Sequence, residues 1–227
     1  MAYALVTNAA ARFTSASSGC TTAGVDTTGS SLIVLGTCRA SGGTGFTVSD
    51  NKSNTWTAMT TSGTDPLGRM YYCINPTVGT GHTWTLSGTN CYANIFVAAF
   101  SYDATPAFDQ EAVHFGTAGS TSDQPGSLTA AANNALLVTL VAGEAITTAY
   151  TIDSSFSITN QQLMVLNQCY AGGLAYLVQP TASATNPTWT WATNQNGTRR
   201  PSTFQMTFIA SGGGGATVKP LAALGVG

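Results

Sequence analysis

The sequence predicts an all-β fold, an antiparallel β-sandwich of jelly-roll type that is built from two sequence-similar halves and followed by an extended C-terminal tail. Three observations support this fold class. Apolar and polar side chains alternate with a two-residue period, turn-forming residues separate the alternating segments, and one phrase occurs twice. No stretch of about ten or more residues shows the period of an amphipathic helix.

The predicted strands show their alternation clearly at residues 70–75. Met70, Tyr72 and Ile74 fall on one face there, which is typical of a half-buried strand. Clusters of Gly, Asn, Asp, Ser and Pro separate such segments and supply the turns. Further strands are expected at residues 31–38, 45–49, 55–59, 82–86, 94–100, 135–142, 149–153, 174–179, 188–192 and 204–210.

Two segments of the chain carry the same pattern of residues. Residues 71–86 read YYCINPTVGTGHTWTL, and residues 175–191 read AYLVQPTASATNPTWTW. Tyr72 and Tyr176 align at an offset of 104, which holds over about 45 residues before loop insertions increase it. Each copy predicts a strand, a Pro-Thr corner that ends the strand, a small-residue loop, and a strand with an inward tryptophan.

The repeat spans approximately residues 25–105 and 130–211 and admits two domain organisations. Either one sandwich is built from two halves, or two small sandwiches follow each other, because each half is long enough to stand alone. We favour a single domain over residues 1–211, since the join contains the strand-like segment EAVHF in place of a bare linker. Residues 212–227 form a separate tail that begins with four glycines.

The chain is nearly uncharged. Charged residues make up 7% of it, against about 25% in an average protein, and the formal net charge is -2. Lys52 and Lys219 form no basic patch, which argues against nucleic-acid binding. The sequence has neither the features of a secretory signal nor an apolar run of the roughly 18 residues that a membrane span needs. We therefore expect cytosolic synthesis, no membrane insertion, and strand edges that neighbouring subunits cover.

The five cysteines are an odd number and form no C-x-x-C motif, so they predict neither a complete disulfide framework nor a zinc site. Most are expected to be small buried residues. Cys20 and Cys38 lie near the start of the fold, and the sequence leaves open whether they form a disulfide. The others are Cys73, Cys91 and Cys169.

Ionisable side chains come together at residues 108–115, which contain Asp109, Glu111 and His114. A strand here would place both carboxylates on one face and His114 on the other, so we interpret the segment as a solvated sheet edge. A hydrolase that uses these three residues is a distant alternative. Common nucleophile, metalloprotease and phosphate-loop motifs are absent, and His82 is the one other histidine. The sequence therefore predicts no enzyme, no catalytic residue and no cofactor.

Two further features have both a binding and a structural interpretation. Exposed tryptophans can stack on sugar rings, but all four tryptophans here lie in Thr-Trp-Thr or Thr-Trp-Ala alternation, which favours core packing. Residues 49–56 are rich in Asx oxygens, as calcium loops are, yet Asp50 is the one carboxylate. A polar turn is therefore expected there, and no metal site.

The tail and one basic spot are the candidate assembly contacts. After its four glycines the tail is mostly apolar and too short for a stable helix, so it needs another protein chain to lie on, through strand addition or an apolar groove. Arg199 and Arg200 precede the last predicted strand and could grip a carboxylate of a neighbouring subunit, although a solvated turn also explains them. The candidate contacts in the tail are Thr217, Val218, Pro220, Leu221 and Leu224.

Several segments together resemble a widespread group of mostly uncharacterised β-sandwich proteins from bacteriophages and bacteria. The resemblance covers about residues 25–210 and implies a non-enzymatic sandwich, which in phages belongs to the particle. It implies no catalytic residue. The segments that carry it are LIVL, FTVSDNKSNTWTAM, MYYCINPTVGTGHTWTL, IFVAAFSYDATPAFDQ, NALLVTLVAG, LAYLVQPTASATNPTWTW and FQMTFIA.

The expected function is that of a structural protein in a phage virion, in the first place a capsid decoration protein and otherwise a tail or fibre component. Its partners would be other virion proteins and further copies of itself. A carbohydrate- or receptor-binding surface module is the alternative. Its candidate glycan contacts are the loop aromatics Tyr92, Tyr102 and Tyr170, with asparagine side chains nearby.

Overall fold

The computed structural model describes residues 2–13, 17–39, 46–60, 67–143, 148–163, 170–192 and 200–211. The predicted all-β class is confirmed, because these residues form eighteen strands and no helix. Every strand pair is antiparallel. Within these ranges nothing resembles a membrane-spanning helix.

The strands vary from two to ten residues in length. In chain order they are β1 (Ala4–Arg12), β2 (Ser17–Thr21), β3 (Leu32–Arg39), β4 (Thr47–Asp50), β5 (Thr57–Ala58), β6 (Leu67–Ile74), β7 (Trp84–Cys91), β8 (Ala93–Ser101), β9 (Pro106–Phe115), β10 (Ser122–Asp123), β11 (Leu128–Thr129), β12 (Ala135–Gly143), β13 (Thr151–Ile152), β14 (Ser157–Gln162), β15 (Ala171–Gln179), β16 (Ala184–Thr185), β17 (Trp189–Thr190) and β18 (Ser202–Ala210).

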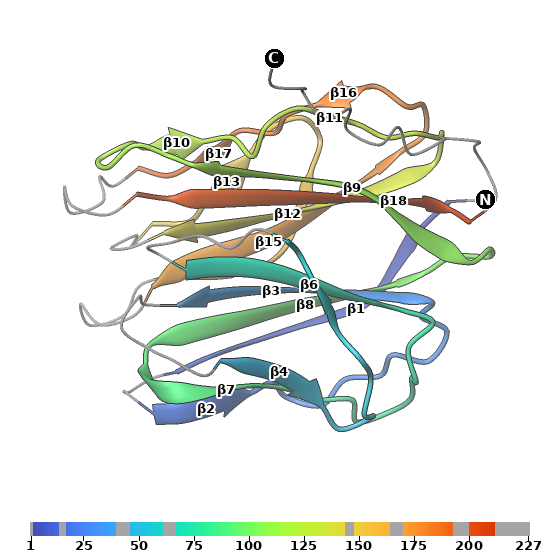
Figure 1. Cartoon of the computed structure of the whole chain (residues 1–227), viewed down its shortest axis with the longest axis horizontal. Helices are drawn as coiled ribbons and strands as arrows, with labels where there is room; N and C mark the ends of the chain where they lie inside the picture. Colours follow the sequence, from blue (N-terminus) through green and yellow to red (C-terminus); the bar gives the residue numbers. More distant parts are fainter. Residues whose placement is uncertain are drawn as a thin grey trace, which may run out of the picture.

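Four layers of sheet lie on top of one another (Figure 1). The outer layers are three-stranded, with the orders β2-β7-β4 and β10-β17-β13. The inner layers are five-stranded, with the orders β1-β8-β3-β6-β5 and β14-β15-β12-β18-β9. A small sheet, β11-β16, accompanies the upper outer layer. The stack is thus a β-sandwich in its coarse architecture, with an additional layer on each side.

The two inner sheets have the same strand order. Read from β1, one sheet runs β1-β8-β3-β6, and read from β9, the other runs β9-β18-β12-β15. The registers also agree, because Val34 pairs with Tyr72 while Val138 pairs with Tyr176, at the offset of 104 seen in the sequence. We call residues 2–101 the first half of the molecule and residues 106–211 the second half.

Hydrophobic alternation located most of the long strands correctly. The face predicted for Met70, Tyr72 and Ile74 does pack against the core between the inner sheets. Two long strands, β1 and β14, were not expected. Their sequences, ALVTNAAAR and SITNQQ, alternate weakly, and both form edges of inner sheets, where a strand buries less of its surface.

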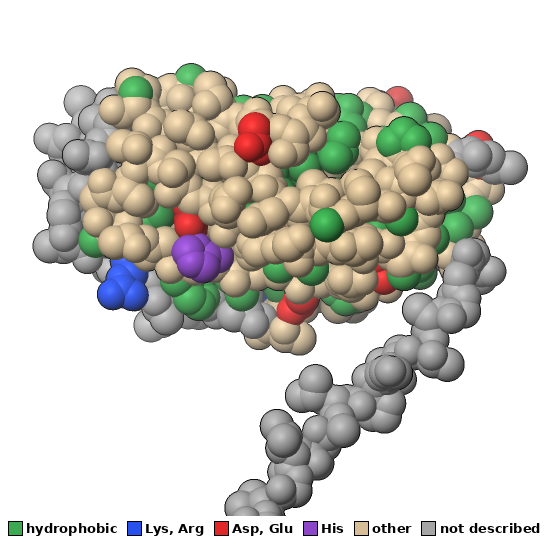
Figure 2. Space-filling model, turned by 90° about the horizontal axis from the view of Figure 1, so that it is seen from above, with side chains coloured by type: hydrophobic (Ala, Val, Ile, Leu, Met, Phe, Trp, Pro, Cys, Tyr) green, Lys and Arg blue, Asp and Glu red, His purple; other side chains and the backbone are tan. Residues whose placement is uncertain are grey.

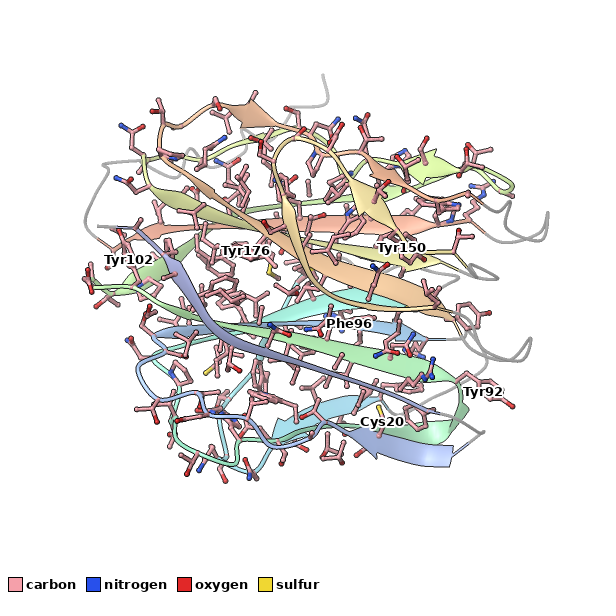
Figure 3. All side chains as sticks on the ribbon, turned by 180° about the vertical axis from the view of Figure 1, so that it is seen from behind. Cys20, Tyr92, Phe96, Tyr102, Tyr150 and Tyr176 are labelled. Carbon is pink, nitrogen blue, oxygen red and sulfur yellow. The ribbon has the colours of Figure 1, made fainter. Side chains whose placement is uncertain are left out.

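Glycines let the inner sheets approach closely in the central core, which both halves share. A Cβ atom at Gly172 in β15 would lie 3.0 Å from Cε2 of Phe96 (Figure 3). One at Gly68 in β6 would lie 2.7 Å from Cζ of Phe204. Each half therefore places a phenylalanine ring over a glycine of the other half, which interlocks the two sheets.

Each inner sheet packs its other face against an outer sheet and so forms a second core. Trp84 in β7 and Trp189 in β17 are completely buried in these outer cores, and Trp191 is 2% exposed. The prediction of buried tryptophans is confirmed for these three. Trp56 is half-buried and donates a hydrogen bond from Nε1 to Oδ2 of Asp50 at 3.1 Å.

The three cores combine features of both domain organisations considered above. Each half has an outer core of its own, as separate sandwiches would, and the halves share the central core, as one sandwich would. Whether residues 1–211 unfold as a single cooperative domain stays a prediction.

Cys20 and Cys38 carry thiols and are not joined in a disulfide. Cys38 is completely buried, and its Sγ donates a hydrogen bond to the carbonyl of Ala171 at 3.1 Å. Burial raises the pKa of Cys20 to about 12, so its thiol is not a reactive nucleophile. Cys73 is a buried thiol too, whereas Cys169 and the side chain of Cys91 lie outside the described part of the chain.

Candidate functional site

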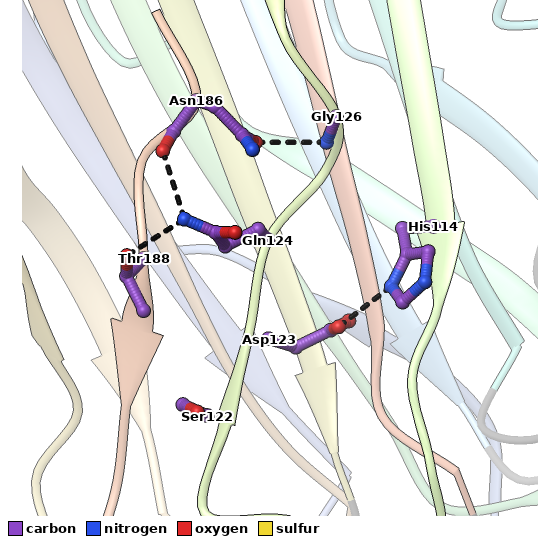
Figure 4. Close-up of a pocket in the computed structure, with 7 residues that line it drawn as sticks. All are labelled: His114, Ser122, Asp123, Gln124, Gly126, Asn186 and Thr188. Atoms are coloured by element: carbon purple, nitrogen blue, oxygen red, sulfur yellow. Dashed lines mark hydrogen bonds and ion pairs between the residues drawn. The ribbon is translucent and has the colours of Figure 1, made fainter.

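A polar pocket in the second half is the candidate binding site (Figure 4). It opens where the end of β9, strand β10 and the loop before β17 meet, and its volume is about 510 Å³. Small-molecule sites commonly have volumes of about 300–1,000 Å³. In the part of the chain that the structure describes, no lysine, arginine or large apolar side chain lines it. The lining residues are His114, Ser122, Asp123, Gln124, Gly126, Asn186 and Thr188.

A buried carboxylate fixes the histidine of the polar pocket. Asp123, whose side chain is 4% exposed, contacts Nδ1 of His114 through Oδ1 at 2.7 Å. Its Oδ2 accepts a hydrogen bond from Oγ1 of Thr203 at 2.9 Å. Burial raises the pKa of Asp123 above 3.8, although the hydrogen bonds from Thr203 and His114 oppose this shift. The His114 side chain itself is 56% exposed.

Two carboxamides form the opposite wall of the polar pocket, and each is held by a backbone group of the segment that carries the other. Nε2 of Gln124 donates to the carbonyl of Asn186 at 3.2 Å and to Oγ1 of Thr188 at 2.9 Å. Oδ1 of Asn186 accepts from the backbone N–H of Gly126 at 3.0 Å. These contacts join the segment after β10 to the loop before β17, so the wall is built from two parts of the chain.

The polar pocket presents binding groups but no assembled nucleophile. Within the described residues, Asp123 is the one hydrogen-bond partner of the His114 ring, and no serine, threonine or cysteine donates to this ring. A triad needs such a nucleophile next to the histidine. The arrangement orients an imidazole and two carboxamides toward solvent, which suits the recognition of a polar ligand.

Strand β9 carries Asp109, Glu111 and His114 at a sheet edge, as predicted, but its two carboxylates do not share a face. Oδ2 of Asp109 accepts from Oγ1 of Thr207 at 3.0 Å on the outer face of β18. Glu111 instead accepts from the backbone N–H of Thr60 at 3.1 Å, toward the first half. The prediction that the carboxylates lie together is therefore wrong.

A β-bulge causes this difference. Phe108 pairs with Phe208 and Gln110 pairs with Thr207, so Asp109 is the extra residue between two consecutive positions of β18. An extra residue on one strand reverses the alternation of side chains beyond it. It separates the two carboxylates and removes the cluster on which the hydrolase alternative depended.

Tyr102 lies at a second shallow pocket, of about 480 Å³, next to Asn133 and Asn134. Its half-buried ring stacks on Tyr3 with 4.0 Å between the ring centroids (Figure 3). Tyr3 is fixed in turn, because its hydroxyl donates to the carbonyl of Ile209 at 3.1 Å. This glycan candidate therefore has an aromatic ring and two carboxamides close together.

The other two glycan candidates differ in exposure. Tyr170 is 6% exposed and packs in the central core, so a glycan cannot reach its ring face, and this prediction is corrected. Tyr170 directly precedes β15. The side chain of Asn94 donates a hydrogen bond to the carbonyl of Tyr170 and so holds this segment against β8. Tyr92 is half-buried between β7 and β8 (Figure 3), and it is not among the described residues that line the polar pocket.

The Asx-rich segment around Asp50 forms the polar turn that was predicted. Oδ1 of Asp50 accepts from the backbone N–H groups of Lys52 and Asn54 at 2.8 and 3.2 Å. Its Oδ2 holds the indole of Trp56. Both carboxylate oxygens thus stabilise the turn. No group of three or more metal-binding side chains occurs in the part of the chain that the structure describes.

The predicted assembly contacts fall almost wholly outside the described residues. Arg200 is described and exposed at the start of the segment that leads into β18. The remaining candidates, Arg199, Thr217, Val218, Pro220, Leu221 and Leu224, lie outside the described ranges.

Comparison with known proteins gives no match for the chain among family models, curated proteins or solved structures.

Sequence reasoning missed most of the polar pocket. His114 was singled out, but its partner Asp123 is nine residues further along, beyond the end of β9. Gln124 and Asn186 lie 62 residues apart and meet through the packing of two loops. The one available signal was the short polar segment SDQ, which contains Asp123 and has the composition of an ordinary exposed turn.

Proposed function

We propose that this protein is a structural component of a bacteriophage particle that acts by adhesion between subunits, in the first place as a capsid decoration protein and otherwise in a tail or fibre. A stack of four sheet layers with a nearly uncharged surface carries this proposal (Figure 2). Such a body contributes shape and hydrogen-bonding groups, and little electrostatic steering. The sequence resemblance to phage sandwich proteins supports the same role.

Strand edges of the outer sheets support an adhesive mechanism. Each outer sheet is three strands wide, so β4 and β13 are edge strands, and Thr47 and Thr151 are exposed on them. An edge strand offers backbone N–H and C=O groups to a neighbouring chain. We propose that virion proteins or further copies of this chain cover such edges, with no role for nucleic acid, membrane insertion or catalysis.

We also propose that each half is a jelly-roll unit and that the two halves are copies of one ancestral sequence. In an eight-stranded jelly roll, strands 1, 8, 3 and 6 form one sheet and strands 2, 7, 4 and 5 form the other. The first half has β1-β8-β3-β6 and β2-β7-β4, and the second has the corresponding orders. The departure is the fifth strand, since β5 and β14 extend the inner sheets.

The mass of the native assembly tests the proposed role. In light scattering, the full chain should form a defined oligomer, or it should form a complex with phage particles that lack this protein. A version that ends at Ser211 should lose the oligomer or the complex, because the apolar tail supplies the docking segment.

A matched pair of tail variants makes this test specific. Leu221→Asp should abolish association, since a charge cannot enter an apolar groove, whereas Thr217→Ser should leave it unchanged. If the full chain and the truncated chain are both monomers and neither binds particles, the adhesive role is excluded.

A surface module that binds glycans is the second candidate, and the pocket at Tyr102 supports it. A stacked aromatic ring beside Asn133 and Asn134 combines a flat apolar face with carboxamides, as sugar sites do. Tyr102→Ala should then abolish binding on a glycan array, while Tyr92→Ala should retain it. Equal binding by both variants would exclude this pocket as the site.

A further inference from the structure

We infer that the polar pocket around His114 is a binding site for a neutral saccharide. This inference concerns a different site from the pocket at Tyr102, and it does not depend on a role in a virion.

The buried carboxylate of Asp123 holds the His114 ring in one position. Removing a carboxylate from water is costly unless hydrogen bonds compensate it, and Asp123 has both oxygens engaged, by His114 and Thr203. Since a carboxylate accepts hydrogen bonds, Nδ1 of His114 carries the proton in this contact. The second ring nitrogen, Nε2, is then an acceptor on a side chain that is 56% exposed and lines the pocket.

Three polar atoms at the polar pocket have no hydrogen-bond partner among the described residues. They are Nε2 of His114, Oε1 of Gln124 and Nδ2 of Asn186, whose other side-chain atoms are engaged. Two of these atoms accept and one donates, and the hydroxyls of Ser122 and Thr188 can do both. A hydroxyl group also donates and accepts, so several neighbouring hydroxyls match this set.

The same lining disfavours other ligand classes. Among the described lining residues, an anion such as phosphate would meet no lysine or arginine, and an apolar ligand would meet no large apolar side chain. A cation would find the carboxylate of Asp123 already held by two donors and 4% exposed. What remains is a neutral compound rich in hydroxyl groups.

The pocket is large enough for more than a single sugar, because a second pocket adjoins it. Asn186 lines both, and the second, of about 410 Å³, contributes the polar side chains of Ser154, Gln179, Ser183 and Thr185. An extended row of hydroxyls and carboxamides along both pockets suits a short oligosaccharide.

The two histidines of the chain provide a direct test, because His82 is an internal control. His82 is completely buried in the first half and stacked on Trp84, far from solvent. We would follow the imidazole signals of both residues by NMR while titrating maltotriose, cellotriose, mannotriose and triacetylchitotriose separately. At least one sugar should shift the His114 signals in a saturable way and leave those of His82 unchanged.

Two variants separate the polar pocket from the pocket at Tyr102. Gln124→Ala removes one acceptor and should weaken the binding detected at His114 about fivefold. Asn133→Ala changes the other pocket and should leave that binding unchanged. The inference is overturned if no sugar shifts His114, or if Gln124→Ala binds as tightly as the unmodified protein. A loss caused by Asn133→Ala alone would assign the glycan to the Tyr102 pocket and overturn it too.

Discussion

Trp84 and Trp189 fill corresponding places in the two outer cores, yet their indole N–H groups meet different surroundings. Nε1 of Trp189 donates to Oγ1 of Thr139 in β12 at 3.0 Å. Nε1 of Trp84 has no partner among the described residues, because Leu35 stands in β3 where Thr139 stands in β12. The first half stacks the ring of His82 on Trp84 instead, with 4.1 Å between centroids.

This difference extends along the last strand of each half. Strand β8 points Ile95, Val97 and Ala99 toward the outer core of the first half. At the corresponding positions, β18 points Thr203, Gln205 and Thr207 toward the outer core of the second half. The two outer threonines of β18 hold the carboxylates of Asp123 and Asp109. The comparison teaches that the polar pocket lies in the half whose last strand carries polar side chains on this buried face, at the places where the other half has aliphatic ones.

In the central core, by contrast, the two halves make similar contacts. The largest expected effect of a substitution on stability lies there. Gly68→Val should destabilise the protein by about 3 kcal/mol, because its side chain overlaps the ring of Phe204. Chemical denaturation measures this loss. Gly173→Ala is the control, since its Cβ meets Trp189 at 3.4 Å and should cost less than about 1 kcal/mol. Equal effects would mean that the halves do not interlock.

The next effect concerns the hydroxyls of the polar half. Thr203→Val keeps the shape of the side chain but removes a donor from the buried carboxylate of Asp123, so it should cost about 2 kcal/mol. Thr37→Val in the first half removes a donor to the backbone carbonyl of Arg69 at 3.2 Å and should cost about 1 kcal/mol. Urea unfolding of both variants gives the comparison. A smaller loss for Thr203→Val would contradict the role assigned to its hydroxyl.

The two buried tryptophans should respond unequally to one substitution. Trp189→Phe leaves the hydroxyl of Thr139 without its donor, whereas Trp84→Phe removes an N–H that has no partner. Trp189→Phe should therefore cost about 1 kcal/mol more. Thermal unfolding with matched denaturant curves measures the difference. Identical losses would show that the hydrogen bond to Thr139 adds nothing net.

The smallest effect is a pH dependence of opposite sign in the two halves. Burial raises the pKa of Asp123 in the folded state, so stability falls as the pH rises from 3.8 through the raised value. The hydroxyl of Thr28 lowers the pKa of Asp26, so its contribution is present above 3.8 and is lost as the pH falls through the lowered value. Unfolding free energies across the acid range, for Asp123→Asn and Asp26→Asn, should diverge in opposite directions from the unmodified protein. Parallel curves would refute this assignment.

The sequence predicted the parts of the fold that depend on local periodicity. Strands β3, β8 and β12 lie close to the predicted ranges because runs of mostly apolar residues define them, and β18 does so because apolar and polar residues alternate along it. Pro76 and Pro180 follow the ends of β6 and β15, as expected of residues that cannot donate to a ladder.

Long-range packing decided what the sequence could not show. The bulge at Asp109 depends on how β9 aligns with β18, about one hundred residues away. The contact between His114 and Asp123 depends on a turn that folds β10 over the end of β9. Neither has a signature in the order of residues, so the polar pocket became visible only in three dimensions.

The short connection at residues 102–105, between β8 and β9, keeps the two halves of the molecule together at low protein concentration. Two half-length chains that met through the same glycine and phenylalanine contacts would separate when their concentration fell below their dissociation constant. Joining them on one chain replaces that concentration by an effective one on the order of millimolar. The contact between the two halves is therefore independent of the protein concentration, and the stacked body persists on dilution.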